Sequence, residues 1–133
     1  MNYLVVDSSF IMADLFPDEK KIDLAIYNIY VPAIFYLECT NVLWGALKKN
    51  RITLGDFQEY QQVLGCLPFT VDKFSATPES IYTIGRICQQ FDLTSYDASY
   101  FELALRLEAK LGTGGKKLIA ASKAYNISIV SIE

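Results

Sequence analysis

Histidine is absent from the 133-residue sequence, and its absence excludes several kinds of active site. A chain without imidazole has no Ser-His-Asp triad, no Cys-His pair and no histidine ligand for a metal ion. Any acid–base or metal chemistry must therefore use carboxylates, lysines, tyrosines or water.

Cysteine is scarce as well, since Cys39, Cys66 and Cys88 are widely spaced and form no C-x-x-C pair. An odd number of distant cysteines favours free, buried thiols over a disulfide framework or a zinc site. No apolar run approaches the roughly 20 residues that cross a membrane, and the N-terminus lacks the basic segment of a signal peptide. We therefore expect a cytoplasmic protein without a membrane segment.

The sequence also lacks an excess of positive charge, with a net charge of −3 and a pI of about 4.9. Nucleic-acid-binding proteins are usually basic, so a polyanionic partner would need local basic patches or a bridging cation. Lys48, Lys49, Arg51, Lys116 and Lys117 are candidate phosphate contacts. A solvated helix end is the simpler explanation of each one alone.

What the sequence has is an apolar content of 52%, ample for the core of a single domain over residues 1–133. Helices and strands are predicted to alternate along the chain. The strands lie at residues 3–6, 30–31, 68–71, 110–113 and 127–132, and the helices at 10–15, 18–26, 33–49, 54–65, 78–91, 95–107 and 116–125. This alternation predicts an α/β fold in which helices cover both faces of a parallel sheet of four to five short strands.

Three acids follow or lie near the ends of predicted strands. Asp7 directly follows the first strand, at the edge where open parallel sheets bind ligands. Glu38 lies early in the longest helix, which Pro32 is expected to open, and Asp97 lies in the first turn of a later helix. Each acid alone also fits a plain structural role, as a cap, a turn or part of a solvated face. Glu102 is expected to be exposed.

Taken together, the three acids are predicted to face one crevice. Three carboxylates about 5 Å apart repel by roughly 3 kcal/mol per pair at a dielectric near 20. Such a cluster needs raised pKa values or a bound cation, and a hard divalent ion, Mg²⁺ or Mn²⁺, suits ligands that are all oxygen. The turn at Thr113-Gly114-Gly115, where a further site residue would be expected, holds no acid. Its glycines match no phosphate-binding motif and are predicted to serve a turn.

These residues resemble the PIN-domain family, and within it the toxin ribonucleases of VapBC toxin–antitoxin systems. The resemblance covers essentially the whole chain. It rests on residues 5–9, on Glu38 with residues 41–43, on residues 93–100 and on residues 111–118.

The resemblance implies a PIN-like three-layer α/β/α fold and metal-dependent hydrolysis of RNA. Asp7, Glu38 and Asp97 match the acids that hold one or two Mg²⁺ or Mn²⁺ ions in the family. The residues implied to support them are Ser8, Asn41 and Thr113. The family's fourth acid falls at Gly115, where this sequence departs from the pattern.

The glycine at that position leaves two interpretations open. The chain is either a metal-dependent ribonuclease, active or weakened, or a catalytically impaired PIN-fold module that binds RNA or an antitoxin. The glycine itself is either a natural loss or a deliberate inactivating substitution. A receiver-like phosphate-accepting domain ranks lower, because Ser8 rather than a second acid follows Asp7.

The resemblance also implies a homodimer that is silenced by an antitoxin protein bound in a groove between helices. Aromatic residues could supply such a surface, although most of them are more simply explained as core. They are Phe10, Phe16, Tyr27, Tyr30, Phe35 and Tyr36.

Overall fold

Five short parallel strands form the central sheet of the structure, a computed structural model that describes residues 2–15 and 23–130. The strand order is β3-β2-β1-β4-β5. The strands are β1 (Tyr3–Val6), β2 (Asn28–Pro32), β3 (Thr70–Asp72), β4 (Lys110–Gly112) and β5 (Ile129–Val130). In the centre, Val5 pairs with Tyr30 of β2 and with Leu111 of β4. The predicted parallel sheet of four to five strands is confirmed.

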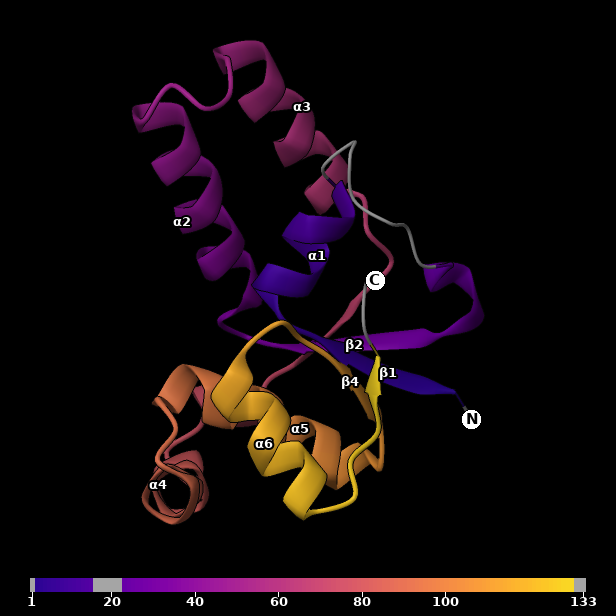
Figure 1. Cartoon of the computed structure of the whole chain (residues 1–133), viewed down its shortest axis with the longest axis vertical. Helices are drawn as coiled ribbons and strands as arrows, with labels where there is room; N and C mark the ends of the chain where they lie inside the picture. Colours follow the sequence, from indigo (N-terminus) through magenta and orange to yellow (C-terminus); the bar gives the residue numbers. More distant parts are fainter. Residues whose placement is uncertain (1, 16–22, 131–133) are drawn as a thin grey trace.

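The helices divide between the two faces of this sheet (Figure 1). One face carries α1 (Ser8–Leu15), α2 (Phe35–Lys48) and α3 (Leu54–Gly65), and the other carries α4 (Ser80–Phe91), α5 (Ser95–Leu107) and α6 (Lys116–Ala124). Two short 3₁₀ turns, η1 (Leu24–Ile26) and η2 (Phe74–Ala76), connect the layers. The arrangement is the predicted three-layer α/β/α fold. Within the described ranges, no helix has the length and apolar character needed to cross a membrane.

Two threonines begin helices in different ways. Thr53 forms a complete capping box before α3, since its hydroxyl accepts the Asp56 N–H at 3.0 Å and its own N–H donates to the Asp56 carboxylate at 3.1 Å. Before α5, the Thr94 hydroxyl accepts the Asp97 N–H at 3.1 Å, but the Asp97 carboxylate does not bind back to the cap. The Asp97 carboxylate is therefore free for another role.

Two predicted features differ in the segment before α2. The helix predicted at 18–26 is wrong from Asp23 onward, where Asp23 is extended and caps the 3₁₀ turn η1; residues 18–22 lie outside the described residues. Pro32 ends β2 and pairs with Asp72 instead of opening a helix. The φ angle that proline imposes fits both a strand end and a first helical residue, so local sequence does not distinguish the two.

Other boundaries shift by a few residues. The helix predicted from Pro78 begins at Ser80, because the Thr77 hydroxyl donates to the Phe74 carbonyl at 2.7 Å and closes η2 instead of capping α4. The predicted final strand at 127–132 is reduced to Ile129–Val130 among the described residues. The strand predicted at 68–71 begins two residues later, at Thr70.

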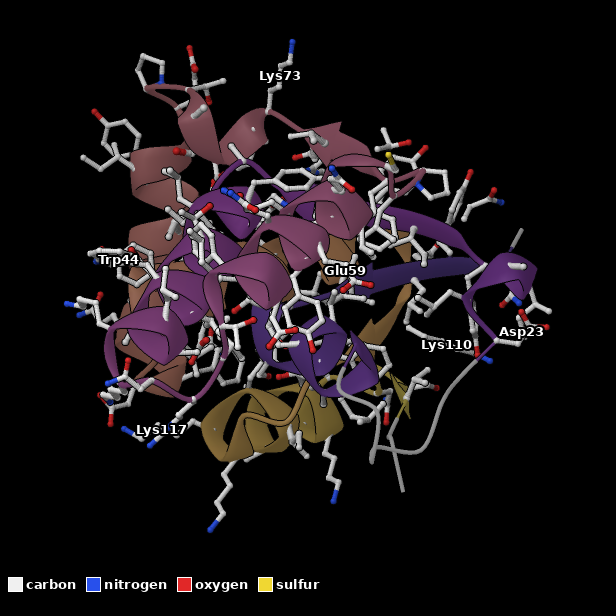
Figure 2. The ribbon with its side chains drawn as sticks, turned by 90° about the horizontal axis from the view of Figure 1, so that it is seen from above. Asp23, Trp44, Glu59, Lys73, Lys110 and Lys117 are labelled. Atoms are coloured by element: carbon white, nitrogen blue, oxygen red, sulfur yellow. The ribbon has the colours of Figure 1, made fainter. Side chains whose placement is uncertain are left out.

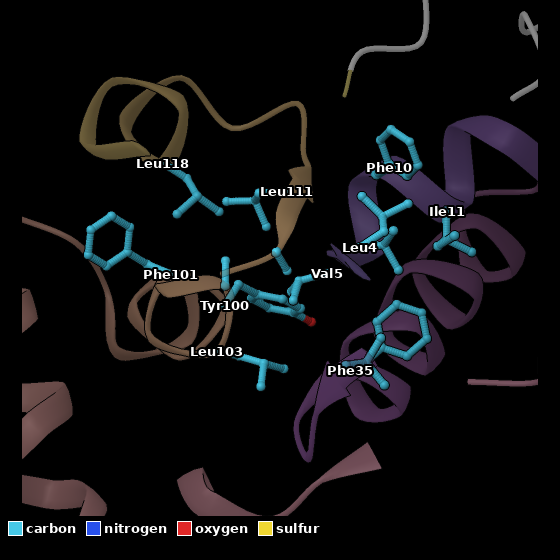
Figure 3. Close-up of a cluster of buried hydrophobic side chains, with 14 of the residues drawn as sticks. Leu4, Val5, Phe10, Ile11, Phe35, Tyr100, Phe101, Leu103, Leu111 and Leu118 are labelled. Atoms are coloured by element: carbon cyan, nitrogen blue, oxygen red, sulfur yellow. The ribbon is translucent and has the colours of Figure 1, made fainter. Parts of the chain in front are cut away.

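The core lies on both faces of β1, where Leu4, Val5 and Val6 are fully buried. Phe35 contributes from the α2 side and Tyr100 from the α5 side (Figure 3). This burial on both faces explains why the sequence of β1 is a continuous apolar run.

The cysteines are free, as predicted, but they are not all buried. Cys39 is buried, Cys88 is partly buried and Cys66 is exposed at the end of α3.

One arginine ties α5 to β3. The Arg106 guanidinium lies 2.6 Å from the Asp72 carboxylate and 2.8 Å from that of Glu102, and it also stacks over the Phe74 ring. We call Arg106, Asp72 and Glu102 the Arg106 clamp. Glu102 is only 8% exposed, so the expectation that it is exposed was wrong. Its burial is possible because Arg106, one turn further along α5, neutralises its charge.

Candidate functional site

Asp7 is fixed at the point where β1 ends between its neighbours. Its N–H donates to the Gly112 carbonyl of β4 at 3.0 Å, and only 7% of the residue is exposed. One carboxylate oxygen accepts the Ser9 hydroxyl at 2.7 Å and the Phe10 N–H at 2.9 Å. The other oxygen accepts the Thr113 hydroxyl. The carboxylate therefore stands at the switch point of the strand order, where open α/β sheets place ligands.

The turn after β4 is attached to the same carboxylate. Thr113 is buried, and its oxygen accepts the Gly115 N–H at 3.0 Å while its hydroxyl donates to Asp7. The Gly114 N–H donates to the Ser9 hydroxyl oxygen at 3.3 Å. These bonds join the first and fourth strands at their carboxyl ends.

Glu38 and Asp97 are both partly buried rather than turned fully to solvent. Glu38 lies in the first turn of α2 and accepts the Tyr100 hydroxyl at 2.6 Å. Burial raises the pKa of Glu38, the Tyr100 hydrogen bond opposes this, and the negative charges of Asp7 and Asp97 raise it further. Burial, and then the charge of Asp7, also raise the pKa of Asp97. The three carboxylates therefore act on one another electrostatically.

We call Asp7, Glu38 and Asp97 the acid site. None of the ion pairs in the described ranges involves it, and no three Asp, Glu or Cys side chains there converge closely enough to hold a metal ion as they stand. In kind, the donors fit a hard divalent cation, because all are carboxylate oxygens and their mutual repulsion favours a positive charge. A cation bound among them would require Glu38 and Asp97 to close on Asp7.

Neither a protein-family model nor a curated protein matches this sequence. Solved structures do match. PAE2754 from Pyrobaculum aerophilum superposes with a TM-score of 0.70 and 22% identity, over 98% of this chain and 89% of that one. FitAcB from Neisseria gonorrhoeae gives 0.61 and 12%, over 95% of both chains. A PilT N-terminus domain protein from Sulfolobus solfataricus P2, SSO1118, gives 0.50 and 14%, over 97% of this chain and 86% of that one.

The chain has the PIN-domain fold. At these identities the likeness concerns the fold, so the chemistry of this chain must be argued from its own residues.

Gly115 stands where the resemblance to the PIN-domain family implies a fourth acid. Its φ of −77° suits any residue, and neither Gly114 nor Gly115 has a positive φ, so the turn does not require glycine. A Cβ at position 115 would lie 3.4 Å from the Thr113 hydroxyl oxygen and 3.7 Å from the Leu118 Cβ, which are tolerable contacts. Gly115 is also the N-cap of α6 without a side-chain cap. The position can therefore accept a carboxylate, and the prediction that the glycines serve the turn conformation was wrong.

The predicted basic contacts fall into two groups. Lys48 ends α2, ten residues after Glu38 and about 15 Å further along the helix axis. Lys49 and Arg51 follow it and are exposed. The Lys48 ammonium lies 5.5 Å from the centre of the exposed Trp44 ring. This group is separated from the acid site by most of α2.

The second group follows the segment from Thr113 to Gly115, which is hydrogen-bonded to Asp7. Lys116 and Lys117 open α6, directly after Gly115, and both are exposed. Lys117 pairs with Asp92 at 3.0 Å. Figure 2 shows Lys117 and Trp44 on the same side of the molecule.

Sequence reasoning missed two side chains that contact the acid site. Ser9, rather than the predicted Ser8, donates to Asp7. The signal for it is the tendency of aspartate to bind groups two residues further on. Tyr100 lies three residues after Asp97, so helical spacing alone puts both on one face of α5. The predicted support residue Asn41 is exposed.

The aromatic residues predicted as core or groove divide as follows. Phe10 and Phe35 are buried in the core. Tyr27, Tyr30 and Tyr36 are partly buried against it. Phe16 lies outside the described residues.

Proposed function

We propose that the protein is a cytoplasmic, metal-dependent endoribonuclease of the toxin type, with Mg²⁺ or Mn²⁺ held by Asp7, Glu38 and Asp97. The observation that carries the proposal is the position of the three carboxylates: Asp7 is fixed where β1 ends beside β4, and Glu38 and Asp97 lie in the first turns of α2 and α5. In the described part of the chain, no basic side chain pairs with them. The mutual repulsion of these carboxylates is unfavourable for folding unless they bind a cation.

The chain's own residues prepare the site. Ser9 and Thr113 hold both oxygens of Asp7, while Asp97, one turn before Tyr100, stands free of its cap. When bound, the ion would polarise the scissile phosphate and lower the pKa of the attacking water. Lys116 and Lys117, which directly follow Gly115, are the candidates for contacts to the RNA backbone.

The test is cleavage of single-stranded RNA by the purified protein with Mn²⁺, with and without a chelator. Cleavage should require the metal, and Asp7→Asn should reduce it by about 100-fold or more, since groups that merely orient a ligand cost 10- to 100-fold. Asp23→Asn is the matched control, because it removes the same charge from an exposed cap at which asparagine also caps. Cleavage that persists in chelator and in Asp7→Asn would show a contaminating nuclease and overturn the proposal.

A second candidate is a catalytically impaired PIN-fold module that binds RNA or an antitoxin. The observation that favours it is Gly115, which leaves the acid site with three carboxylates although a fourth would fit. Gly115→Asp tests it. Metal-dependent cleavage that appears only in Gly115→Asp supports an impaired chain, whereas strong cleavage by both proteins supports the enzyme.

The proposal includes a homodimer and an antitoxin partner. An open pocket of about 940 Å³ lies between the start of α2, η2, α4 and α5. Its exposed apolar side chains are Leu37, Ile81, Tyr82 and Tyr96. Tyrosine-rich patches with few charges are typical of the core of a protein interface, and a second copy of the chain is the proposed occupant. Light scattering should show a dimer that Ile81→Glu converts to a monomer, and co-expression with a neighbouring small reading frame tests the antitoxin.

A further inference from the structure

Tyr100 links α2 and α5, the two helices that contain Glu38 and Asp97. It lies in α5 one turn after Asp97, it is 1% exposed, and its hydroxyl donates to the Glu38 Oε1 of α2 at 2.6 Å. In Figure 3 its ring lies in the core below Val5, with the hydroxyl oxygen on the side of α2. The bond spans 62 residues of sequence, so it ties α2 to α5 at the acid site.

The chemistry of this contact favours a permanent donor. A tyrosine hydroxyl in the core needs a hydrogen-bond partner, and a carboxylate makes that bond short and strong. The Tyr100 hydroxyl is therefore the donor of this bond, and the Glu38 carboxylate is its acceptor.

The three carboxylates differ in how firmly they are held. Asp7 has donors on both oxygens, whereas Glu38 has one donor, to Oε1. In the described ranges, the other Glu38 oxygen has no donor. Glutamate also has a long, flexible side chain with more rotamer freedom to lose than aspartate. Without Tyr100, no other hydrogen bond in the described structure would fix the direction of the Glu38 carboxylate.

We propose that Tyr100 is the positioning residue that keeps the Glu38 carboxylate in one direction, so that its free oxygen loses less freedom when Glu38 closes on a divalent cation together with Asp7 and Asp97. The inference rests on the proposed function and deepens it. Tyr100 itself touches neither the metal nor the RNA. It acts through Glu38 as a partner that orients a ligand, and such partners set metal affinity.

The experiment compares Tyr100→Phe with wild type by calorimetric titration of Mn²⁺ without RNA. Affinity should fall roughly 10- to 100-fold, the range for lost orienting partners of metal ligands. Tyr125→Phe is the matched control. It removes a tyrosine hydroxyl that accepts the side-chain amide of Gln90 in α4, a helix that contributes no residue to the acid site. It should leave Mn²⁺ affinity unchanged. In RNA cleavage, Tyr100→Phe should raise the Mn²⁺ concentration for half-maximal rate while keeping most of the rate at saturating metal.

A purely structural role would give a different pattern. It would lower the melting temperature and the rate together, without moving the metal dependence. To separate loss of fold from loss of positioning, Tyr100→Phe is also placed in a Glu38→Ala background. There it should cause no further loss of Mn²⁺ affinity, since Glu38 is the residue that it positions.

The outcomes distinguish this inference from the proposed function. If wild type binds Mn²⁺ and cleaves RNA but Tyr100→Phe binds Mn²⁺ equally well, the positioning role is overturned and the ribonuclease stands. A further loss of affinity in the Glu38→Ala background also overturns it. If neither wild type nor Gly115→Asp binds Mn²⁺, the proposed metal site fails, and the role of Tyr100 fails with it.

Discussion

Two groups of carboxylates in this molecule differ in how their negative charge is compensated. In the Arg106 clamp, one guanidinium pairs with both Asp72 and Glu102, so each carboxylate has a cation within the protein. In the acid site, the donors to Asp7 and Glu38 are hydroxyls and one backbone N–H, which carry no net charge.

The difference indicates which group is structural and which is poised to bind. The clamp holds α5 to β3 through an arginine that pairs with both carboxylates. The acid site holds Asp7 and Glu38 by neutral hydrogen-bond donors and leaves the charge of its carboxylates uncompensated within the described residues. A site of this kind is stabilised by a cation from outside the chain.

The largest expected effect separates the two groups by metal affinity. Asp97→Asn should weaken Mn²⁺ binding by about 100-fold or more, because it removes a proposed ligand. Asp72→Asn in the clamp should leave Mn²⁺ affinity unchanged. Calorimetric titration measures both. Equal losses in the two variants would show that the metal does not use the acid site.

The next effect concerns stability, which the clamp variant should lower and the acid-site variant should not. Arg106→Met leaves the buried Glu102 and Asp72 without their cation, and we expect a loss of about 2 kcal/mol in the free energy of unfolding. This lies below the range for fully buried pairs because Arg106 is 39% exposed and partly screened. Asp97→Asn should not destabilise the metal-free protein, since it relieves repulsion. Urea unfolding in chelator measures both variants, and an unchanged Arg106→Met would contradict the structural role of the clamp.

A smaller effect tests whether the acid site is one carboxylate short. Gly115→Asp should raise Mn²⁺ affinity by about 10-fold, because a fourth negative charge strengthens the attraction for the cation. Gly115→Asn is the control, since it supplies the same helix cap without the charge. If both variants bind Mn²⁺ alike, the gain reflects capping and position 115 does not face the metal.

The smallest effect is the pH dependence of the metal-free protein. Burial and neighbouring charge raise the pKa of Glu38 and of Asp97 in the folded state above their unfolded values. Between the unfolded value of about 4 and the raised folded values, the folded chain binds more protons than the unfolded one. The stability from these two groups is therefore complete below the unfolded pKa and is lost as the pH rises through the folded pKa.

This pH effect has its own measurement and control. Unfolding in chelator from about pH 4 to neutral pH should show the loss, and Glu38→Gln with Asp97→Asn should flatten it. Saturating Mn²⁺ should remove it as well, because the cation replaces the proton. A slope that is unaltered in the double variant would assign the pH dependence to other carboxylates.

Much of the fold followed from local signals. The apolar run of β1 and the alternation of elements were enough to predict the parallel sheet and its two helical layers. The errors lie where one local signal fits two structures. Pro32 suits a strand end as well as a helix start, and Thr77 caps a 3₁₀ turn instead of α4.

The candidate site was predictable in its acids and less so in their environment. Asp7, Glu38 and Asp97 were chosen because strand ends and the helix turns after them are expected to meet at one edge. In the structure Asp7 follows β1, and Glu38 and Asp97 lie in the first turns of α2 and α5, while their role as site residues stays a prediction. Helix periodicity alone slightly favoured a solvated face for Glu38, although apolar positions flank it. In the structure Glu38 is partly buried, and its carboxylate accepts the Tyr100 hydroxyl.

The sequence by itself determined which residue types stand at the carboxyl edge of the sheet, because strand period and helix caps are set by near neighbours in the chain. Only the tertiary structure decided which of them touch. The bond from Thr113 to Asp7 spans 106 residues, and that from Arg106 to Asp72 spans 34. Such contacts depend on the order of strands in the sheet and on the side-chain rotamers that packing allows. That order gave one group of acids an arginine and left the acid site without a cation of its own in the described structure.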